Sequence, residues 1–145
     1  MKKNPKISII TVCYNSAKHL EQCIKSVLDQ DYPNLEYLVI DGGSTDGTID
    51  IISKYRDKIA YFVSESDNGI SDVFNKGIKA ATGDIIGIIN SDDFMMPNAL
   101  QKISEYYEDD IDVYRGYCLI WDEKLDSKRK LYPNERFSVP PFGAI

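Results

Sequence analysis

The sequence predicts an α/β fold with an open, mostly parallel sheet that carries helices on both faces. Apolar, β-branched runs alternate with stretches whose apolar residues recur at helical spacing, from residue 6 to about residue 121. Because this alternation is strict and the connections are short, the strands are expected to be parallel and the crossovers right-handed. A chain of 145 residues fits one domain with a substantial core.

The first strand is expected at residues 6–13, which are mostly apolar and β-branched, as in a strand covered on both faces. A helical pattern begins at Ser16, a possible N-cap residue. The apolar residues of this pattern fall on one face of a helix: Leu20, Cys23, Ile24, Val27 and Leu28. The polar and proline-containing residues 31–34 then end the helix.

The same strand, loop and helix unit recurs until the pattern stops near residue 121. The later elements are expected in this order: a strand at 35–40, a loop at 41–47, a helix at 48–55, a strand at 59–63, a loop at 65–69, a helix at 70–81, a strand at 84–89, a helix that starts around Pro97 and buries Leu100, Ile103 and Tyr107, and a strand at 111–121. Residues 122–145 contain three prolines and do not continue the alternation.

The composition is that of a globular protein and argues against nucleic acid as a partner. Seventeen basic and 23 acidic side chains give a net charge of −6. Binding to phosphate backbones instead needs clustered Lys and Arg. The basic cluster at residues 128–130 is expected to be a solvated turn.

Cysteine usage and the N-terminus favour a reduced, cytoplasmic setting. Cys13, Cys23 and Cys118 are odd in number and form no C-x-x-C pair, so neither a disulfide framework nor a zinc site is expected. The apolar run at residues 7–12 is too short for a signal peptide or a membrane span. Any membrane contact is therefore expected to be peripheral, at the inner face of the membrane.

Acidic residues follow several of the expected strands. Ligands of an open parallel sheet bind outside the carboxyl ends of its strands, and four acids are expected to converge there: Asp41, Asp67, Asp92 and Asp93. Because clustered carboxylates repel one another, a divalent cation is their usual partner. Oxygen ligands favour Mg²⁺ or Mn²⁺, and two or fewer carboxylates suffice where a diphosphate completes the coordination shell. The acids therefore predict half of a metal–diphosphate site.

The sequence lacks two common nucleotide-binding motifs. No G-x-G-x-x-G follows the first strand, and no G-x-x-x-x-G-K-[ST] occurs. A different ordered set of motifs spans residues 6–120: Val12-Cys13-Tyr14-Asn15, Asp41-Gly42-Gly43-Ser44-Thr45-Asp46-Gly47-Thr48, Asp67-Asn68-Gly69, Asn75-Lys76-Gly77-Ile78, Ala81-Thr82-Gly83-Asp84 and Asn90-Ser91-Asp92-Asp93. By this set the chain resembles the family 2 inverting glycosyltransferases, which have the Rossmann-like GT-A fold.

The resemblance implies a site for a nucleotide sugar, usually a UDP sugar. Thr11 and Asp41 would contact the nucleobase, with Asn15 and Ser44 supporting the pocket. A carboxylate only accepts hydrogen bonds, so Asp41 suits the recognition of a base N–H. Tyr14 is a candidate to stack on the base, although an aromatic residue at a strand end is as often a packing residue.

The resemblance also places a divalent cation at the motif that ends the fourth predicted strand. Asp93 would be the direct ligand of Mn²⁺ or Mg²⁺, and Asp92 would lie near the ribose. Ser91 replaces the first acid of the family's D-x-D pattern. Asp67 is a candidate donor-site contact, with an ordinary loop residue as the alternative.

The implied reaction transfers a sugar from the donor to a glycan or lipid-linked acceptor with inversion, in cell-surface polysaccharide synthesis. The acceptor hydroxyl attacks as the diphosphate leaves, and a general base takes its proton. Asp122, Glu123 and Glu135 are expected to be turn residues, so the catalytic base is unknown and expected beyond Ile145. The chain is therefore expected to be one C-terminally truncated domain, with an α/β core at 1–121 and the start of the acceptor region at 122–145.

Less specific interpretations remain open. The Asp and Gly residues of 41–47 are also natural turn residues, and an acid pair at 92–93 also suits the start of a helix. A non-catalytic nucleotide-sugar-binding module is the second class of function, which acceptor-dependent transfer would exclude. A flavodoxin-like signalling domain would carry its acid pair after the first strand, where this chain has Tyr14-Asn15.

Three further residues have ordinary structural interpretations that are favoured over a role in the site. Lys76 is expected to be a solvated helix lysine that does not reach the diphosphate. His19, the sole histidine, is expected to be exposed at a helix start, and Trp121 is expected to be a packing residue.

Overall fold

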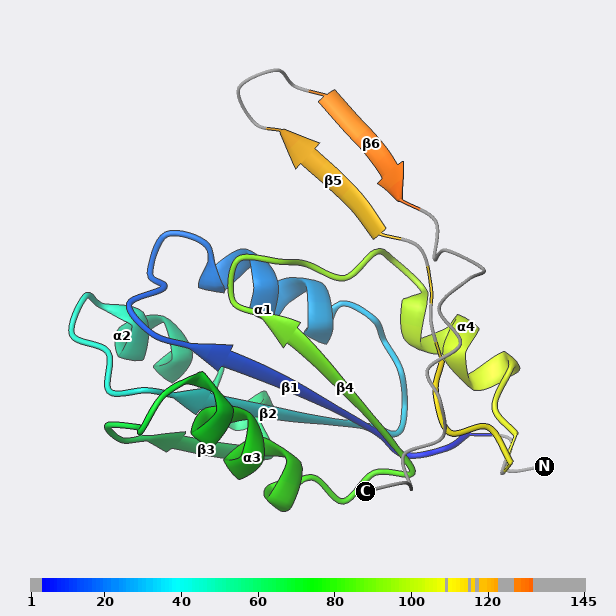
Figure 1. Cartoon of the computed structure of the whole chain (residues 1–145), viewed down its shortest axis with the longest axis horizontal. Coiled ribbons are helices and arrows are strands. Elements are labelled where there is room, and N and C mark those ends of the chain that lie inside the picture. Colours follow the sequence, from blue (N-terminus) through cyan, green and yellow to red (C-terminus); the bar gives the residue numbers. More distant parts are fainter. Residues whose placement is uncertain (1–3, 109, 115, 117, 123–126, 132–145) are drawn as a thin grey trace, which may run out of the picture. The chain divides into compact units, whose positions relative to one another are not determined.

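A four-stranded parallel sheet forms the centre of the first of two compact units, Met1–Glu108 and Asp109–Ile145. The computed structural model describes residues 4–108, 110–114, 116, 118–122 and 127–131. The four strands of the sheet are β1 (Ile7–Cys13), β2 (Leu35–Asp41), β3 (Tyr61–Ser64) and β4 (Ile85–Asn90). Their order is β3-β2-β1-β4 (Figure 1). The predicted open parallel α/β sheet is therefore confirmed.

Helices connect the strands of the first unit. They are α1 (Leu20–Leu28), α2 (Thr48–Ser53), the 3-10 helix η1 (Arg56–Lys58), α3 (Ile70–Ala80) and α4 (Ala99–Glu105). The predicted helix at 48–55 is thus shorter in the structure, and η1 follows it before β3. Ser16 does not cap α1 with its side chain, because its hydroxyl bonds to Ser91 and to the Tyr14 carbonyl instead.

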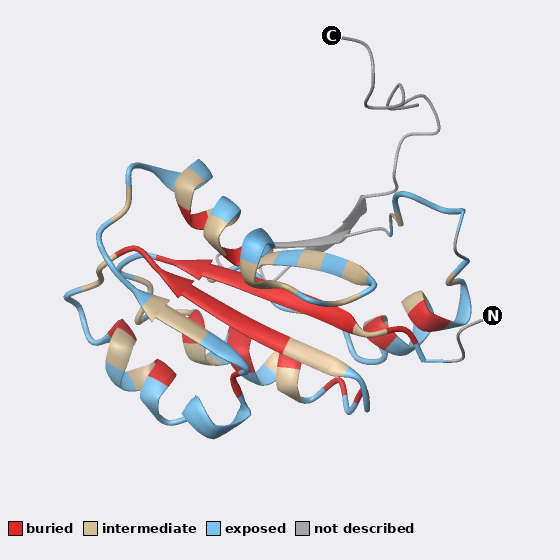
Figure 2. Cartoon of the chain, turned by 90° about the horizontal axis from the view of Figure 1, so that it is seen from below, coloured by how far each residue is buried: buried red, intermediate tan, exposed pale blue. Residues whose placement is uncertain are grey.

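The side chains of β1 alternate between two buried clusters. Ile7, Ile9 and Cys13 pack on the face that α1, α2 and α4 cover, whereas Ile10 and Val12 pack with α3 on the other face. All seven residues of β1 are buried, and Figure 2 shows that burial is greatest in the central strands. The expectation that the first strand is covered on both faces is confirmed.

The edge strand β4 is covered on one face only. Ile85 and Ile89 pack against the cluster beneath α1, but Ile86 and Ile88 on the opposite face are 43% and 47% exposed. This alternation arises because α3 packs on β1 and β2. Full coverage by helices therefore holds for the central strands and not for β4.

A carboxylate connects three segments at the amino-terminal end of the sheet. Glu36 accepts hydrogen bonds from Lys6 Nζ at 2.5 Å, Ser8 Oγ at 2.5 Å and the Thr82 backbone N–H at 2.8 Å. Burial raises the pKa of Glu36, but the hydrogen bonds from Lys6, Ser8 and Thr82 outweigh it and lower the pKa to about 2. This network joins β1, β2 and the connection before β4.

The second unit contains an antiparallel pair, β5 (Cys118–Asp122) and β6 (Ser127–Leu131). The expectations of a turn at 128–130 and of a turn residue at Asp122 are therefore wrong, because these residues pair in the two strands. The prediction of a fifth strand of the parallel sheet at 111–121 is wrong, because β5 pairs with β6 and residues 110–114 and 116 have no strand structure. Pairing with a segment a few residues away closes a short loop, which costs little entropy. Glu123 and Glu135 lie outside the described residues.

Candidate functional site

A cavity of about 690 Å³ opens at the carboxyl ends of β1 and β4. These two strands are hydrogen-bonded neighbours, yet β1 continues along the chain to β2 and β3 on its other side. Such a reversal of strand order leaves a crevice outside the sheet, where ligands of α/β proteins bind. The lining residues are Val12, Cys13, Tyr14, Asn15, Ser16, Lys18, His19, Asp67, Ile70, Val73, Asn90, Ser91 and Asp92.

Half of the predicted site residues line this cavity. Tyr14, Asn15, Asp67 and Asp92 are brought together there from three different segments. The other four, Thr11, Asp41, Ser44 and Asp93, are not among the lining residues. The hydrogen bonds and the burial of these four residues show where their side chains lie instead.

Asp41 ends β2 and is almost completely buried, with 1% of its surface exposed. Oδ2 accepts hydrogen bonds from the Gly43 and Ser44 amides at 3.0 and 2.9 Å and from Ser64 Oγ at 2.7 Å. Oδ1 accepts a hydrogen bond from Ser44 Oγ. Burial raises the pKa of Asp41, but the bonds from Ser44, Ser64 and Gly43 outweigh burial and leave the pKa lowered.

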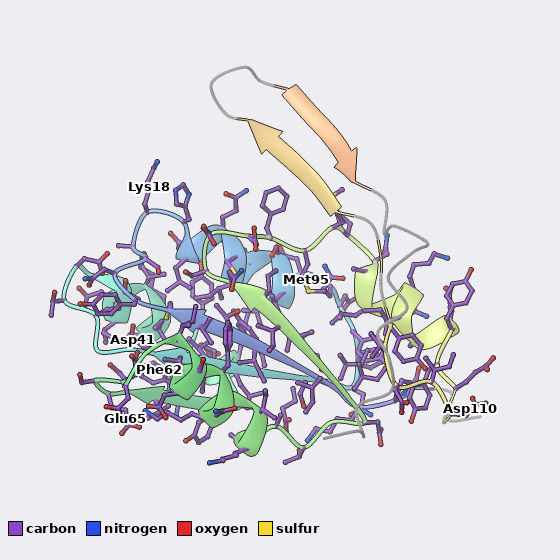
Figure 3. All side chains as sticks on the ribbon, viewed as in Figure 1. Lys18, Asp41, Phe62, Glu65, Met95 and Asp110 are labelled. Carbon is purple, nitrogen blue, oxygen red and sulfur yellow. The ribbon has the colours of Figure 1, made fainter. Side chains whose placement is uncertain are left out.

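The Asp41 carboxylate therefore organises the 41–44 loop in its charged form. Figure 3 places Asp41 at the carboxyl end of its strand, as the sequence predicted. Its oxygens, however, are already occupied by donors of the protein. Ser64, which sequence reasoning missed, lies 23 residues away, and only the pairing of Asp41 with Ser64 in the sheet brings the two together.

Asn15 and Ser44 connect the segment after β1 to the loop after β2 through hydrogen bonds. The Asn15 amide donates to Ser44 Oγ at 2.8 Å, and Asn15 Oδ1 accepts from the Thr45 amide at 2.9 Å. Asn15 adopts a left-handed backbone conformation with φ of 47°, which Asn tolerates better than most residues. The pair expected to support the pocket is thus brought together, with Asn15 on the cavity side.

Thr11 lies below the site, in the core. It is fully buried, and its hydroxyl is hydrogen-bonded to Tyr37 OH at 2.9 Å. Side chains alternate along a strand, so Cys13 is the next residue on the same face and reaches the cavity in its place. The structure thus gives Thr11 a packing role, and sequence reasoning missed Cys13 although the strand period points to it.

Cys13 Sγ lies against the carboxylate of Asp41, at 3.6 Å from Oδ1. Burial and the negative charge of Asp41 raise the pKa of the Cys13 thiol, so Cys13 is a neutral, unreactive wall of the cavity.

Asp67 reaches the cavity across Gly42. Its Oδ1 accepts a hydrogen bond from the Gly69 amide at 2.7 Å. A β-carbon on Gly42 would overlap Asp67 Oδ2 and would lie 3.5 Å from Cδ2 of Tyr14. The absence of a side chain at Gly42 therefore allows Asp67 and Tyr14 to share one wall of the cavity.

Asp92 and Asp93 begin the segment after β4, and both side chains are exposed. Asp92 lines the cavity, and Asp93 Oδ2 accepts a hydrogen bond from Asn90 Nδ2 at 3.3 Å. Among the described residues, no three acidic, His or Cys side chains are close enough together to hold a metal ion. Asp67 and Asp92 line the same cavity, whereas the Asp41 carboxylate turns into its own loop, so the four acids do not form one metal-binding cluster.

Two adjacent exposed carboxylates still fit a Mg²⁺ or Mn²⁺ ion whose other ligands come from a diphosphate and water. These ions retain several positions for water and for ligand phosphates, and one or two protein carboxylates suffice when a diphosphate supplies the rest. A cation bound by protein groups alone would need more ligands than Asp92 and Asp93 supply. The donor set therefore fits a metal that binds together with a diphosphate.

Lys76 and His19 differ in their relation to the cavity. Lys76 pairs with Glu65 at 2.9 Å and with Asp72 at 3.0 Å, so it is an ion-paired rather than a solvated helix lysine, and it is not among the residues that line the cavity. His19 precedes α1 and does line it, so it is not simply an exposed helix-start residue. The side chain of Trp121 lies outside the described part of the chain.

The model of the glycosyl transferase family 2 matches residues 8–142 of this chain. The chain belongs to this family. It is 37% identical over 145 residues to an uncharacterised glycosyltransferase of Rickettsia typhi, an alignment that covers 95% of this chain and 45% of that protein. The chain thus spans less than half the length of this relative.

Two solved glycosyltransferases resemble the structure. S. aureus TarS 1–349 in complex with UDP is 31% identical with a TM-score of 0.63, over 69% of this chain and 31% of the TarS 1–349 chain. TarS is also known in complex with UDP-GlcNAc. The mannosyltransferase PcManGT of Pyrobaculum calidifontis, in complex with GDP-Man and Mn²⁺, is 29% identical with a TM-score of 0.60, over 66% of this chain and 30% of PcManGT.

These similarities confirm the predicted family and fold. The family 2 glycosyltransferase expected from the ordered motifs is shown by the family match, and the GT-A type of sheet is shown by the solved neighbours. In the described residues, no helix combines the length and the hydropathy that crossing a membrane requires.

Proposed function

We propose that this glycosyltransferase transfers a sugar from a UDP donor to a glycan or lipid-linked acceptor, with inversion and with the help of Mn²⁺ or Mg²⁺, in cell-surface polysaccharide synthesis. The observation that carries the proposal is the cavity at the ends of β1 and β4, where Tyr14, Asp67 and Asp92 are gathered. The TarS complexes with UDP and UDP-GlcNAc support a uridine donor. GDP is the alternative nucleotide, because PcManGT is known with GDP-Man.

In this proposal the nucleoside lies between Tyr14 and Asp67. Tyr14 is 64% exposed, and an exposed aromatic residue suits stacking on a base. The Asp67 carboxylate beside it accepts hydrogen bonds from base N–H or ribose hydroxyl groups. Asp41 and Thr11 support this wall from behind, since both are enclosed in the protein.

The start of the segment after β4 would hold the diphosphate and a divalent cation. Asp93 is proposed as the direct metal ligand and Asp92 as a contact of the ribose. A bound divalent cation offsets the negative charge that develops on the departing diphosphate. Asp92 and Asp93 contribute by presenting exposed carboxylates next to the cavity.

Calorimetric titration with UDP and with GDP, each with and without Mn²⁺, tests this proposal. Wild type, Asp93→Ala and a control, Asp57→Ala, are compared. Asp57 is an exposed acid on η1, before β3 and so at the opposite end of that strand from the site, and its removal changes the net charge equally. We expect UDP binding that Mn²⁺ strengthens in wild type and in the control, and that no longer responds to Mn²⁺ in Asp93→Ala.

Folded wild-type protein that binds neither nucleotide would refute the donor site, and a preference for GDP would correct the donor. Transfer of the sugar to an acceptor is a separate measurement. Donor binding without acceptor-dependent transfer in a protein of the full length of its relatives would favour a non-catalytic nucleotide-sugar-binding module.

A further inference from the structure

The segment that carries Asp92 and Asp93 is held from one side by α1. This acidic segment, residues 90–98, joins β4 to α4 and has no regular secondary structure at 93–96. The positions of its exposed carboxylates depend on the contacts that hold the backbone of this segment. Side chains on α1 and at its two ends make the contacts that do so.

Two contacts hold the beginning of the acidic segment. Ser16 Oγ and Ser91 Oγ are hydrogen-bonded at 2.8 Å. The Cys23 thiol donates to the Asn90 carbonyl at 3.4 Å, and burial raises the pKa of Cys23 to about 11, so the thiol keeps its proton.

Two other side chains hold the end of the segment. Ser26 Oγ accepts a hydrogen bond from the Met95 amide at 2.9 Å. Gln30 Nε2 donates to the Met96 carbonyl at 3.0 Å, and Gln30 Oε1 accepts from the Leu100 amide at 3.2 Å. Gln30 is 6% exposed and also donates to the Ser26 carbonyl at 2.9 Å, so its amide is fully used.

The four holding residues lie on α1 and at its two ends. Cys23 and Ser26, three residues apart, lie on one face of α1, while Ser16 precedes the helix and Gln30 follows it. Figure 3 shows Met95 beside α1, where its side chain packs against the core. The backbone of Asp92 and Asp93 is thus fixed before and behind by α1.

We propose that Ser26 and Gln30 are positioning residues that set the affinity of the site for a divalent cation together with a diphosphate. The inference rests on the proposed donor function, because it gives Asp92 and Asp93 their ligands. Neither residue lines the cavity, so neither touches the nucleotide. Both act through the backbone of the acidic segment.

The test compares wild type with Ser26→Ala and Gln30→Met in the full chain. Mn²⁺ binding is titrated at saturating UDP by the paramagnetic resonance signal of free Mn²⁺, and UDP binding without metal is measured by calorimetry. Ser53→Ala is the matched control for Ser26→Ala: the Ser26 hydroxyl donates to the Cys23 carbonyl of α1, and the Ser53 hydroxyl likewise donates to the Ile49 carbonyl of α2. Hydrogen exchange of the Asp93 amide, which donates to the Asn90 carbonyl, reports the segment without any ligand.

We expect both variants to weaken Mn²⁺ binding by about 10- to 100-fold, the usual effect of losing a residue that orients a metal ligand. Metal-free UDP binding should weaken much less than Mn²⁺ binding, because Tyr14 and Asp67 do not lie on this segment, and exchange of the Asp93 amide should become faster. Folded variants that bind Mn²⁺ as wild type does would overturn the proposal. If wild type binds neither UDP nor Mn²⁺, the donor function fails, and the exchange rate alone decides: faster exchange supports positioning by α1, and unchanged exchange overturns it.

Discussion

Gly42→Ala is expected to weaken UDP binding by displacing Asp67. A β-carbon at position 42 would overlap Asp67 Oδ2, so the carboxylate must move by about 1 Å to regain an ordinary van der Waals separation. That movement breaks the 2.7 Å hydrogen bond from the Gly69 amide and misplaces the acceptor that the nucleotide meets. A hydrogen bond to a charged group contributes about 1.5–3 kcal/mol, which corresponds to about 10- to 150-fold in the dissociation constant.

The same substitution should change stability little. Alanine reduces the conformational freedom of the unfolded chain and so favours the folded state by about 0.4–1 kcal/mol. The lost bond between Asp67 and the Gly69 amide is exposed and costs about 1 kcal/mol. Because these contributions oppose each other, weaker UDP binding by Gly42→Ala could not be attributed to unfolding.

A double-mutant cycle separates this steric mechanism from a general disturbance of the loop. UDP affinity is measured by calorimetry for wild type, Gly42→Ala, Asp67→Ala and the double variant. Alanine at position 67 has no carboxylate to displace, so Gly42→Ala should add little to the effect of Asp67→Ala. If the two effects add fully, the residues are energetically independent and the steric reasoning is refuted.

Three further predictions concern other parts of the unit. Tyr14→Ala should weaken UDP binding by about 5- to 150-fold, since stacking of a base on an aromatic ring contributes about 1–3 kcal/mol, and Tyr14→Phe should retain it; calorimetry in which Phe loses as much as Ala would contradict stacking. Asp41→Ala should lower the free energy of unfolding in urea by about 3–5 kcal/mol, because several donors lose a charged acceptor; wild-type stability would contradict the organising role of the carboxylate. Glu36→Gln should lower the free energy of unfolding by about 1–2 kcal/mol at pH 7. This is less than the full pKa shift corresponds to, because solvent screens the ion pair with the partly exposed Lys6. Since the folded pKa of Glu36 is about 2 and lies below its ordinary value, this difference should shrink as the pH falls from about 4.5 toward 2, and a pH-independent difference would contradict the linkage.

The elements of the first unit could be predicted because their patterns are local. The run at 6–13 carries β-branched residues on both faces, and β1 is buried on both faces. The strand expected at 111–121 failed for a physical reason: an apolar run indicates an extended segment but does not specify its partner. Residues 118–122 pair with 127–131, which a pattern of apolar residues cannot distinguish from pairing in the parallel sheet.

At the site, too, the position of a residue could be predicted from the sequence, but the direction of its side chain could not. Tyr14, Asn15, Asp67 and Asp92 could be placed at the site, because a residue just after a strand lies at the carboxyl edge of the sheet. Asp41 gives the same signal in the sequence, but its carboxylate is turned inward by donors that include the distant Ser64. The direction of a side chain depends on such partners, which the position in the chain does not reveal.

The order of the strands explains why acids at equivalent positions have different roles. The strand order reverses between β1 and β4, so the crevice lies over their ends, whereas β2 lies between β1 and β3 and its end is enclosed. An acid after β4 can therefore remain exposed toward a ligand, but one at the end of β2 must be satisfied by protein donors, because an unpaired buried charge is costly. It follows that substitutions in the 41–44 loop should act mainly on stability, with Gly42 as the exception through its contact with Asp67. Substitutions at Tyr14, Asp67 and Asp92 should act mainly on affinity.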